Sequence, residues 1–173
     1  YGVEQNELLE DIKNLIDNHA PTYPTIKRTK GEHLLVINPA DIHIGKLAVA
    51  LETGDEYNSE IACKRVLEGV TGLLSKSKGF SIDRVLHIDN VYNQTTAGTR
   101  QDVNGKWWQH FELALDLYVK CVEILREVAP VDVVHSMSNH DYQSGFHLAH
   151  ALKSWFRNAK DVTFDISVAH RKY

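Results

Sequence analysis

Apolar positions along the chain follow two periods, one typical of helices and one typical of strands. Helical spacing predicts helices over residues 4–18, from Asn58 or Ser59 to the run at 75–79, over 106–128 and over 144–158. Short apolar runs predict strands over residues 33–38, 84–88, 131–135 and 162–166. From residue 33 onward strands and helices alternate, which predicts right-handed crossovers. We therefore expect an α/β fold, a layered sandwich with a mainly parallel sheet flanked by helices.

The pattern also predicts which side chains face the core. The first strand is a continuous apolar run, as expected in a sheet that is covered on both faces. Asn58 or Ser59 is expected to cap the second helix and Ser144 the fourth. Trp107 and Trp108 are interpreted as packing residues rather than as a base-stacking platform. The inward stripes are predicted to be Ala62, Val66, Val70 and Leu73, then Phe111, Ala114, Tyr118, Val122, Leu125 and Val128, then Leu148, Leu152, Trp155 and Phe156.

Residues 1–32 differ in pattern from the rest of the chain. An amphipathic helix is followed by residues 19–32, which contain Pro21, Pro24 and a basic cluster of Lys27, Arg28 and Lys30. Prolines and clustered charge predict a solvated linker. We therefore divide the chain into an amino-terminal helix and linker at 1–32, compatible with the tail of an upstream module, and a domain at 33–173.

Composition narrows the class of protein. The chain has 173 residues, 43% apolar and 24% charged, which suits one globular domain with a short appendage. A net charge of -4 argues against binding nucleic acid through general basicity. We expect a cytoplasmic protein without a membrane span, because no apolar run reaches about eighteen residues. Cys63 and Cys121 fall in helical patterns and are predicted to be reduced core thiols.

Polar residues follow three of the predicted strands. In parallel sheets, ligands bind outside the carboxyl ends of the strands. Carboxylate, imidazole and amide ligands suit Mn, Fe or Zn better than Ca. Two such ions can polarise a phosphoryl group and activate water, so this arrangement points to phosphate ester hydrolysis. The residues after the first three strands are Asp41 and His43, then Asp89 and Asn90, then Asn139, His140 and Asp141.

These clusters resemble the first three motifs of the calcineurin-like metallophosphoesterases. Residues 139–146, with Thr95-Thr96-Ala97-Gly98-Thr99 before them, are similar to phage-encoded members described as DNA repair exonucleases. The resemblance covers residues 33–173 and implies a binuclear phosphodiesterase acting on DNA. It implies two divalent metal ions, with Mn expected first and Fe, Zn or Mg as alternatives.

The resemblance also implies a role for each matching residue. Asp41 and His43 would bind the first ion, Asp89 would bridge the pair, and Asn139 would bind the second ion. His140 would act as the acid over the phosphate, and Asp141 would orient the loop or His140. The polar loop at 93–105 is expected to contact substrate through Thr95, Thr96 and Arg100.

The chain departs from the family pattern at three places. Ile88 replaces the glycine before the bridging aspartate, and counting back from Asn93 puts Asn90 rather than Asp89 at the bridging position. Ser138 replaces the glycine of the third motif. The later histidine motifs of the family are absent. The resemblance therefore implies the amino-terminal half of an α/β/β/α fold, whose open sheet needs an oligomer or a carboxyl-terminal portion to complete the site.

Two other functional hypotheses follow from the residues. The departures at Ile88, Asn90 and Ser138 favour, as the alternative, a catalytically degenerate phosphoesterase fold that acts as a binding or assembly module. A nucleotide-binding domain is disfavoured because no glycine-rich loop follows any strand. The remaining histidines are interpreted as structural or surface residues. His87 and His135 are expected to be packed, His147 and His150 to form a surface pair, and His19, His33 and His110 to have no assigned role.

Overall fold

The computed structural model describes residues 20–89, 102–136 and 142–167. Its elements are β1 (His33–Ile37), α2 (Ala50–Thr53), α3 (Ser59–Lys76), β2 (Ile82–Asp89), α4 (Trp107–Arg126), β3 (Val131–His135), α5 (Tyr142–Trp155) and β4 (Val162–Asp165). The four strands form one sheet in the order β1-β2-β3-β4, and every neighbouring pair is parallel. The predicted α/β class and parallel sheet are confirmed.

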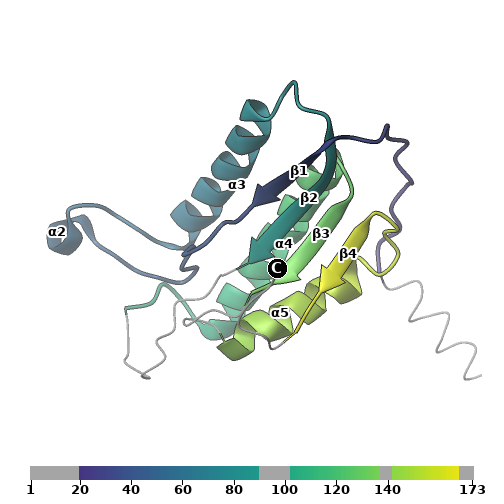
Figure 1. The fold of residues 1–173 in the computed structure, drawn as a ribbon. Helices are drawn as coiled ribbons and strands as arrows, with labels where there is room; N and C mark the ends of the chain where they lie inside the picture. Colours follow the sequence, from purple (N-terminus) through teal and green to yellow (C-terminus); the bar gives the residue numbers. More distant parts are fainter. Residues whose placement is uncertain (1–19, 90–101, 137–141, 168–173) are drawn as a thin grey trace, which may run out of the picture.

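The long helices α3, α4 and α5 lie on the same face of the sheet (Figure 1). This follows from the strand order, because each crossover moves one strand in the same direction and right-handed crossovers then place every helix on one side. Burial alternates accordingly along β3, where Val131, Val133 and His135 are buried and the residues between them are half-buried. The other face of the sheet is not covered by any of these helices.

The expectation that β1 is covered on both faces is wrong for the described part of the chain. Leu34 and Val36 are 60% and 51% exposed, whereas Ile37 on the helix side is 1% exposed. The continuous apolar run suggested two covered faces, but the sequential strand order leaves one face of the sheet without a helix layer. Leu34 and Val36 therefore lie on an open face.

The core lies between the sheet and the three long helices. Its largest fully buried side chains include Tyr118, Phe156, Ile44, Leu125 and Leu148. Cys121 is buried and Cys63 half-buried, both as free thiols, which confirms that prediction. Burial raises the pKa of the Cys121 thiol to about 12 and also raises that of Cys63, so both stay protonated at neutral pH.

The helix ends differ from the prediction in detail. Asn58 caps α3 as expected, since its side chain accepts a hydrogen bond from the Ile61 amide. α5 begins at Tyr142, so Ser144 lies inside the helix and is not its cap. Val128, predicted to lie in the inward stripe, follows the end of α4 and is 39% exposed. Leu73, also predicted to face inward, is 48% exposed near the end of α3.

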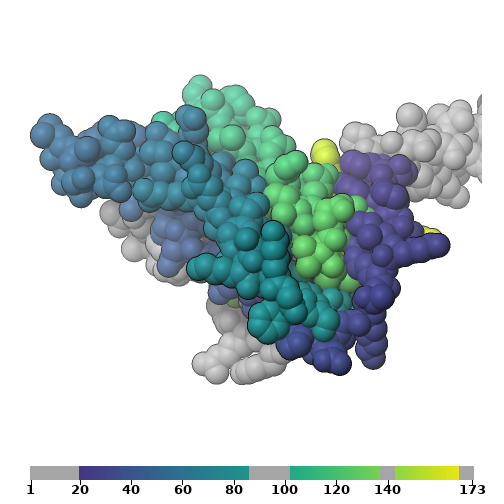
Figure 2. All heavy atoms as spheres, turned by 90° about the horizontal axis from the view of Figure 1, so that it is seen from above, coloured from purple at the N-terminus to yellow at the C-terminus, as the bar shows by residue number. Residues whose placement is uncertain are grey.

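Residues 20–32 pack against the domain instead of forming a solvated linker. In Figure 2 this purple segment lies against the green residues of the chain's middle part. Ala20 is buried, and the Tyr23 ring stacks on Phe156 at 5.1 Å between centroids. Lys27 and Lys30 are exposed, as predicted for the basic cluster. Arg28 is not, because its side chain is only 15% exposed and pairs with Asp161 at 2.9 Å.

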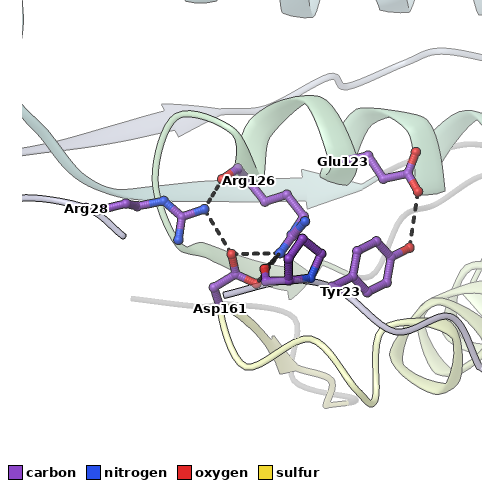
Figure 3. A network of polar contacts seen from close by, with 6 residues as sticks. Tyr23, Arg28, Glu123, Arg126 and Asp161 are labelled. Carbon is purple, nitrogen blue, oxygen red and sulfur yellow. Dashed lines mark hydrogen bonds and ion pairs between the residues drawn. The ribbon is translucent and has the colours of Figure 1, made fainter. Parts of the chain in front are cut away.

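A polar network fixes this segment to the ends of α4 and β4 (Figure 3). Asp161 accepts hydrogen bonds from both Arg28 and Arg126, and Arg126 also donates to the Pro24 carbonyl. Burial alone would raise the pKa of the Asp161 carboxyl, but the two guanidinium groups outweigh burial and hold that pKa below its ordinary value. Tyr23 donates to Glu123 at 3.1 Å and accepts from the Trp155 indole at 3.0 Å.

Across the described ranges, no helix is both long enough and apolar enough to span a bilayer.

Candidate functional site

The ends of β1, β2 and β3 meet at one edge of the sheet, which we call the carboxyl edge (Figure 1). β2 extends two residues past its last pairing with β1, which joins Ile37 to His87. Asp89 is the last residue of β2, and its Cα pairs with that of His135 at the end of β3. Parallel pairing therefore brings the carboxyl ends of these three strands to the same edge.

Asp41 and His43 lie on the loop that leaves β1, here called the Asp41 loop (residues 38–48). Burial alternates along it. Ile42 and Ile44 are 5% and 0% exposed and anchor the loop in the core, whereas the Asp41 side chain is 73% exposed. Burying two isoleucines stabilises this conformation by about 1.5–3 kcal/mol each. The Asp41 carboxylate is thereby turned toward solvent, and the His43 side chain is half-buried.

The imidazole of His43 and the carboxylate of Asp41 are close to each other. His43 Nε2 stands 3.8 Å from Asp41 Oδ1, and the His43 side chain is 21% exposed. Two ligands of one ion, each about 2.1 Å from it, must lie within about 4.2 Å of each other. The measured spacing lies within that upper limit, and a tetrahedral ion would draw the two atoms together to about 3.4 Å.

The backbone at both residues is unusual. Asp41 has φ 55° and His43 has φ 50°, in the left-handed region that residues with a Cβ rarely adopt. Each costs about 1–2 kcal/mol. Such strain persists only where surrounding contacts impose it, and it is found disproportionately at functional sites.

Tyr57 holds the middle of the Asp41 loop. Its hydroxyl donates a hydrogen bond to the Ile42 carbonyl, and Ala48 and Tyr57 exchange two backbone hydrogen bonds. Burial raises the pKa of the Tyr57 phenol, an effect that the nearby Arg65 guanidinium only partly offsets. Tyr57 therefore remains a neutral donor at physiological pH.

His110 fixes the far end of the loop, a role that the sequence did not indicate. Its Nε2 lies 2.6 Å from the Asn104 carbonyl, which accepts the hydrogen bond, and the Asn104 amide donates to the Gly45 carbonyl at 2.7 Å. Gly45 has φ 97°, and a Cβ there would stand 2.6 Å from the His110 ring. The available signal was a glycine two residues after His43, but sequence alone could not pair it with His110.

Several predicted site residues lie outside the described residues: Asn90, Thr95, Thr96, Arg100, Asn139, His140 and Asp141. The structure gives the backbone of Asp89 but not the position of its side chain. Within the described ranges, no three or more His, Cys, Asp or Glu side chains gather as a metal site. Asp41 and His43 are thus the predicted ligands whose side chains are brought together.

A cavity of about 640 Å³ lies beside the Asp41 loop, between the first turns of α4 and α5. Its lining includes Ile44 and His110, with Trp107, Trp108 and Phe111 from α4. The expectation that the two tryptophans are packed is wrong, because Trp107 is 76% exposed and Trp108 is 45% exposed. They lie in the first turn of α4, ahead of the buried stripe that begins at His110.

The structure tests the predictions for three of the other histidines, His135, His147 and His150. His135 is 1% exposed and lies edge-on to the Phe146 ring at 6.2 Å, so its packed position is confirmed. His147 and His150 are both exposed on α5, as predicted for a surface pair. The side chain of His87 lies outside the described part of the chain.

Comparison with protein-family models, with curated proteins and with solved structures finds no match to this chain.

Proposed function

We propose that this chain is a binuclear metal-dependent phosphodiesterase that hydrolyses DNA as a nuclease in the cytoplasm. The observation that supports it most is the Asp41–His43 pair, strained in backbone, 3.8 Å apart and turned outward at the carboxyl edge. Two buried isoleucines and the Tyr57 hydroxyl hold this strained backbone in place. The same conformation brings a carboxylate and an imidazole close together, as binding a cation requires.

The donor set agrees with a transition metal. One carboxylate and one imidazole suit Mn, Fe or Zn, with Mn the species we expect. Asp41 and His43 would hold the first ion, Asp89 would bridge, and Asn139 would hold the second. When bound, the two ions would polarise the phosphoryl group and lower the pKa of the attacking water.

The remaining roles belong to the protein's own side chains. His140 would donate a proton to the leaving oxygen, a contribution on the order of 100- to 10,000-fold. Asp141 would orient His140, and Thr95, Thr96 and Arg100 would contact the substrate backbone. A second copy of the chain or a carboxyl-terminal portion would supply the missing ligands.

The choice of bridging residue has its own test. If Asp89 bridges, Asp89→Asn should remove the second ion, whereas Asn90→Asp should change little. If Asn90 occupies that position, the exchange to aspartate should instead strengthen metal binding. Isothermal calorimetry with Mn²⁺ distinguishes these outcomes.

The decisive experiment is a Mn²⁺ titration of the chain beside Asp41→Ala, followed by nuclease assays on linear duplex and single-stranded DNA. Asp116→Ala, which removes an exposed carboxylate from α4, is the matched control. Metal binding that is lost in Asp41→Ala alone would support the proposal. Two ions per chain with DNA cleavage would mean that the site is complete, and one weakly bound ion would fit a half-site that awaits its remaining ligands. Absence of binding would contradict it and favour a degenerate fold that acts as a binding module.

A further inference from the structure

The cavity beside the Asp41 loop combines flat aromatic surface with hydrogen-bonding groups. Trp107, Trp108 and Phe111 contribute the aromatic surface, and Glu112, Ser144 and His147 also line it. Its volume of about 640 Å³ lies within the range of small-molecule sites. Such a mixture is suited to a ring that is apolar on its faces and polar at its edge.

The exposure of the two tryptophans is the first argument for a ligand. Trp107 and Trp108 are adjacent in sequence and 76% and 45% exposed at the rim of one cavity. Large aromatic side chains normally bury most of their area. Exposed aromatics next to a groove are the usual platform on which unpaired bases stack.

Charge is the second argument, and it decides which part of a nucleotide can enter. Among the described residues that line the cavity, Glu112 contributes a carboxylate and none is a lysine or an arginine. An anionic phosphate would be repelled there, whereas a neutral base with amino hydrogens would be attracted. Carboxylates accept hydrogen bonds from the exocyclic amino group of cytosine, so amino-bearing bases should be preferred over thymine.

Position is the third argument. Ile44 forms part of the cavity wall and directly follows His43, and His110 lines the cavity while contacting the Asp41 loop through Asn104. A base held in the cavity therefore belongs to a strand whose neighbouring phosphate lies near the carboxyl edge. The cavity lies next to the Asp41 loop, whereas Asp41 itself lines a separate hollow with Tyr57 and Arg65.

We propose that this cavity is a nucleobase subsite, which binds an unpaired, amino-bearing base of a DNA strand next to the phosphate to be cleaved. The proposal rests on the proposed function, because only a nuclease at the carboxyl edge gives a captured base its role. It extends that function by predicting that single-stranded or frayed ends are preferred and that the base identity matters.

The test is fluorescence quenching of a Trp155→Phe background, in which Trp107 and Trp108 are the remaining tryptophans. Oligo(dC) and oligo(dT) are titrated in EDTA, so that base binding is measured without metal. From the quenching curves, we expect oligo(dC) to bind at least fivefold more tightly than oligo(dT). Trp107→Ala or Trp108→Ala should weaken oligo(dC) binding about tenfold, measured by anisotropy of a labelled oligonucleotide.

Two variants serve as controls for this experiment. Glu112→Gln should reduce the preference for dC over dT while keeping the overall fold, because Glu112 is exposed. Phe80→Ala removes another exposed aromatic, 59% accessible and just before β2, and should leave binding unchanged.

Two results would overturn the proposal. One is equal or absent quenching by the two oligonucleotides. The other is concentration-dependent self-association that is abolished by Trp107→Ala, which would make the tryptophans a protein contact. Failure of the metal site would be a separate result. The Mn²⁺ titration tests the metal site without DNA, and the quenching assay tests base binding without metal.

Discussion

At the scale of single residues, the most informative feature is the left-handed backbone at Asp41 and His43. A side chain at such a position costs free energy that a glycine would not. Aspartate and histidine are among the side chains that adopt this conformation more often than others do, so the residue types present are compatible with the observed backbone.

The strain at Asp41 gives a direct prediction. Asp41→Gly and Asp41→Ala both remove the carboxylate, but only glycine adopts φ 55° without a penalty. We expect Asp41→Gly to be more stable than Asp41→Ala by about 1 kcal/mol in urea unfolding, the reverse of the usual order of these residues. Equal stabilities, or a more stable alanine variant, would show that the backbone is not strained.

The contact of Gly45 with His110 gives a second prediction. Gly45→Ala places a Cβ 2.6 Å from the ring and is expected to cost about 2–4 kcal/mol in urea unfolding, from strain and overpacking together. Gly54→Ala is the matched control, because Gly54 also has positive φ but no neighbour within 4 Å of the added Cβ. It should cost about 1–2 kcal/mol, from strain alone. If both substitutions cost the same, the contact with His110 is unimportant.

At the scale of elements, α4 joins the two ends of the molecule. Its first turn forms part of the cavity and positions His110 against the Asp41 loop. Its last residue, Arg126, is 4% exposed and pairs with Asp161. Residues 20–32 are attached at this second end, so the network in Figure 3 stabilises the edge opposite the candidate site.

Acid stability should depend on this network. Because the pKa of Asp161 in the folded chain lies below its ordinary value of 3.8, its stabilisation is complete above about pH 5. That stabilisation is lost as pH falls through the folded pKa. Asp161→Asn should lower the free energy of unfolding by about 2–3 kcal/mol at pH 7, since two guanidinium groups lose their partner.

The difference between the wild-type chain and Asp161→Asn should narrow below about pH 4, where the carboxyl becomes protonated. Urea unfolding at a series of pH values measures it. Asp116→Asn, on the exposed side of α4, is the control. It should change neither the free energy of unfolding at pH 7 nor its dependence on pH. A difference that stays constant from pH 7 to pH 3 would contradict the pairing of Asp161 with the two arginines.

At the scale of the whole molecule, the open face of the sheet is the main consequence of the strand order. It includes Leu34 and Val36 on β1 and an ion pair between Arg84 and Asp132 at 2.8 Å. Thr163 donates to the same Asp132 carboxylate. The face is therefore apolar toward β1 and polar toward β4.

The two faces can be compared with one substitution. Val36→Thr on the open face should change the free energy of unfolding by less than about 0.5 kcal/mol. Val133→Thr on the covered face, where the side chain is fully buried, should cost about 1–3 kcal/mol for burying a hydroxyl. Equal costs, measured by urea unfolding of both variants, would mean that the face of Leu34 and Val36 is covered in solution.

The sequence by itself determined the elements and their class, because period-2 and period-3.6 patterns are local properties. It indicated β1, β2, β3 and β4 within a few residues, the cap at Asn58, and the buried stripe around Tyr118 and Leu125. It also singled out Asp41 and His43, because a polar pair directly after an apolar strand is visible without any tertiary information. Their proposed role in metal binding remains a prediction.

Tertiary structure alone decided how distant segments meet. Strand order determined that β1 has an open face, and this order is not encoded in the apolar run itself. The pairing of Arg28 with Asp161 and the contact of His110 with Gly45 depend on residues 133 and 65 positions apart. Such contacts arise from packing across the whole fold. The ion pair of Arg28 with Asp161, the contact of His110 with the Asp41 loop and the cavity lined by Trp107 and Trp108 could therefore not be inferred from local pattern.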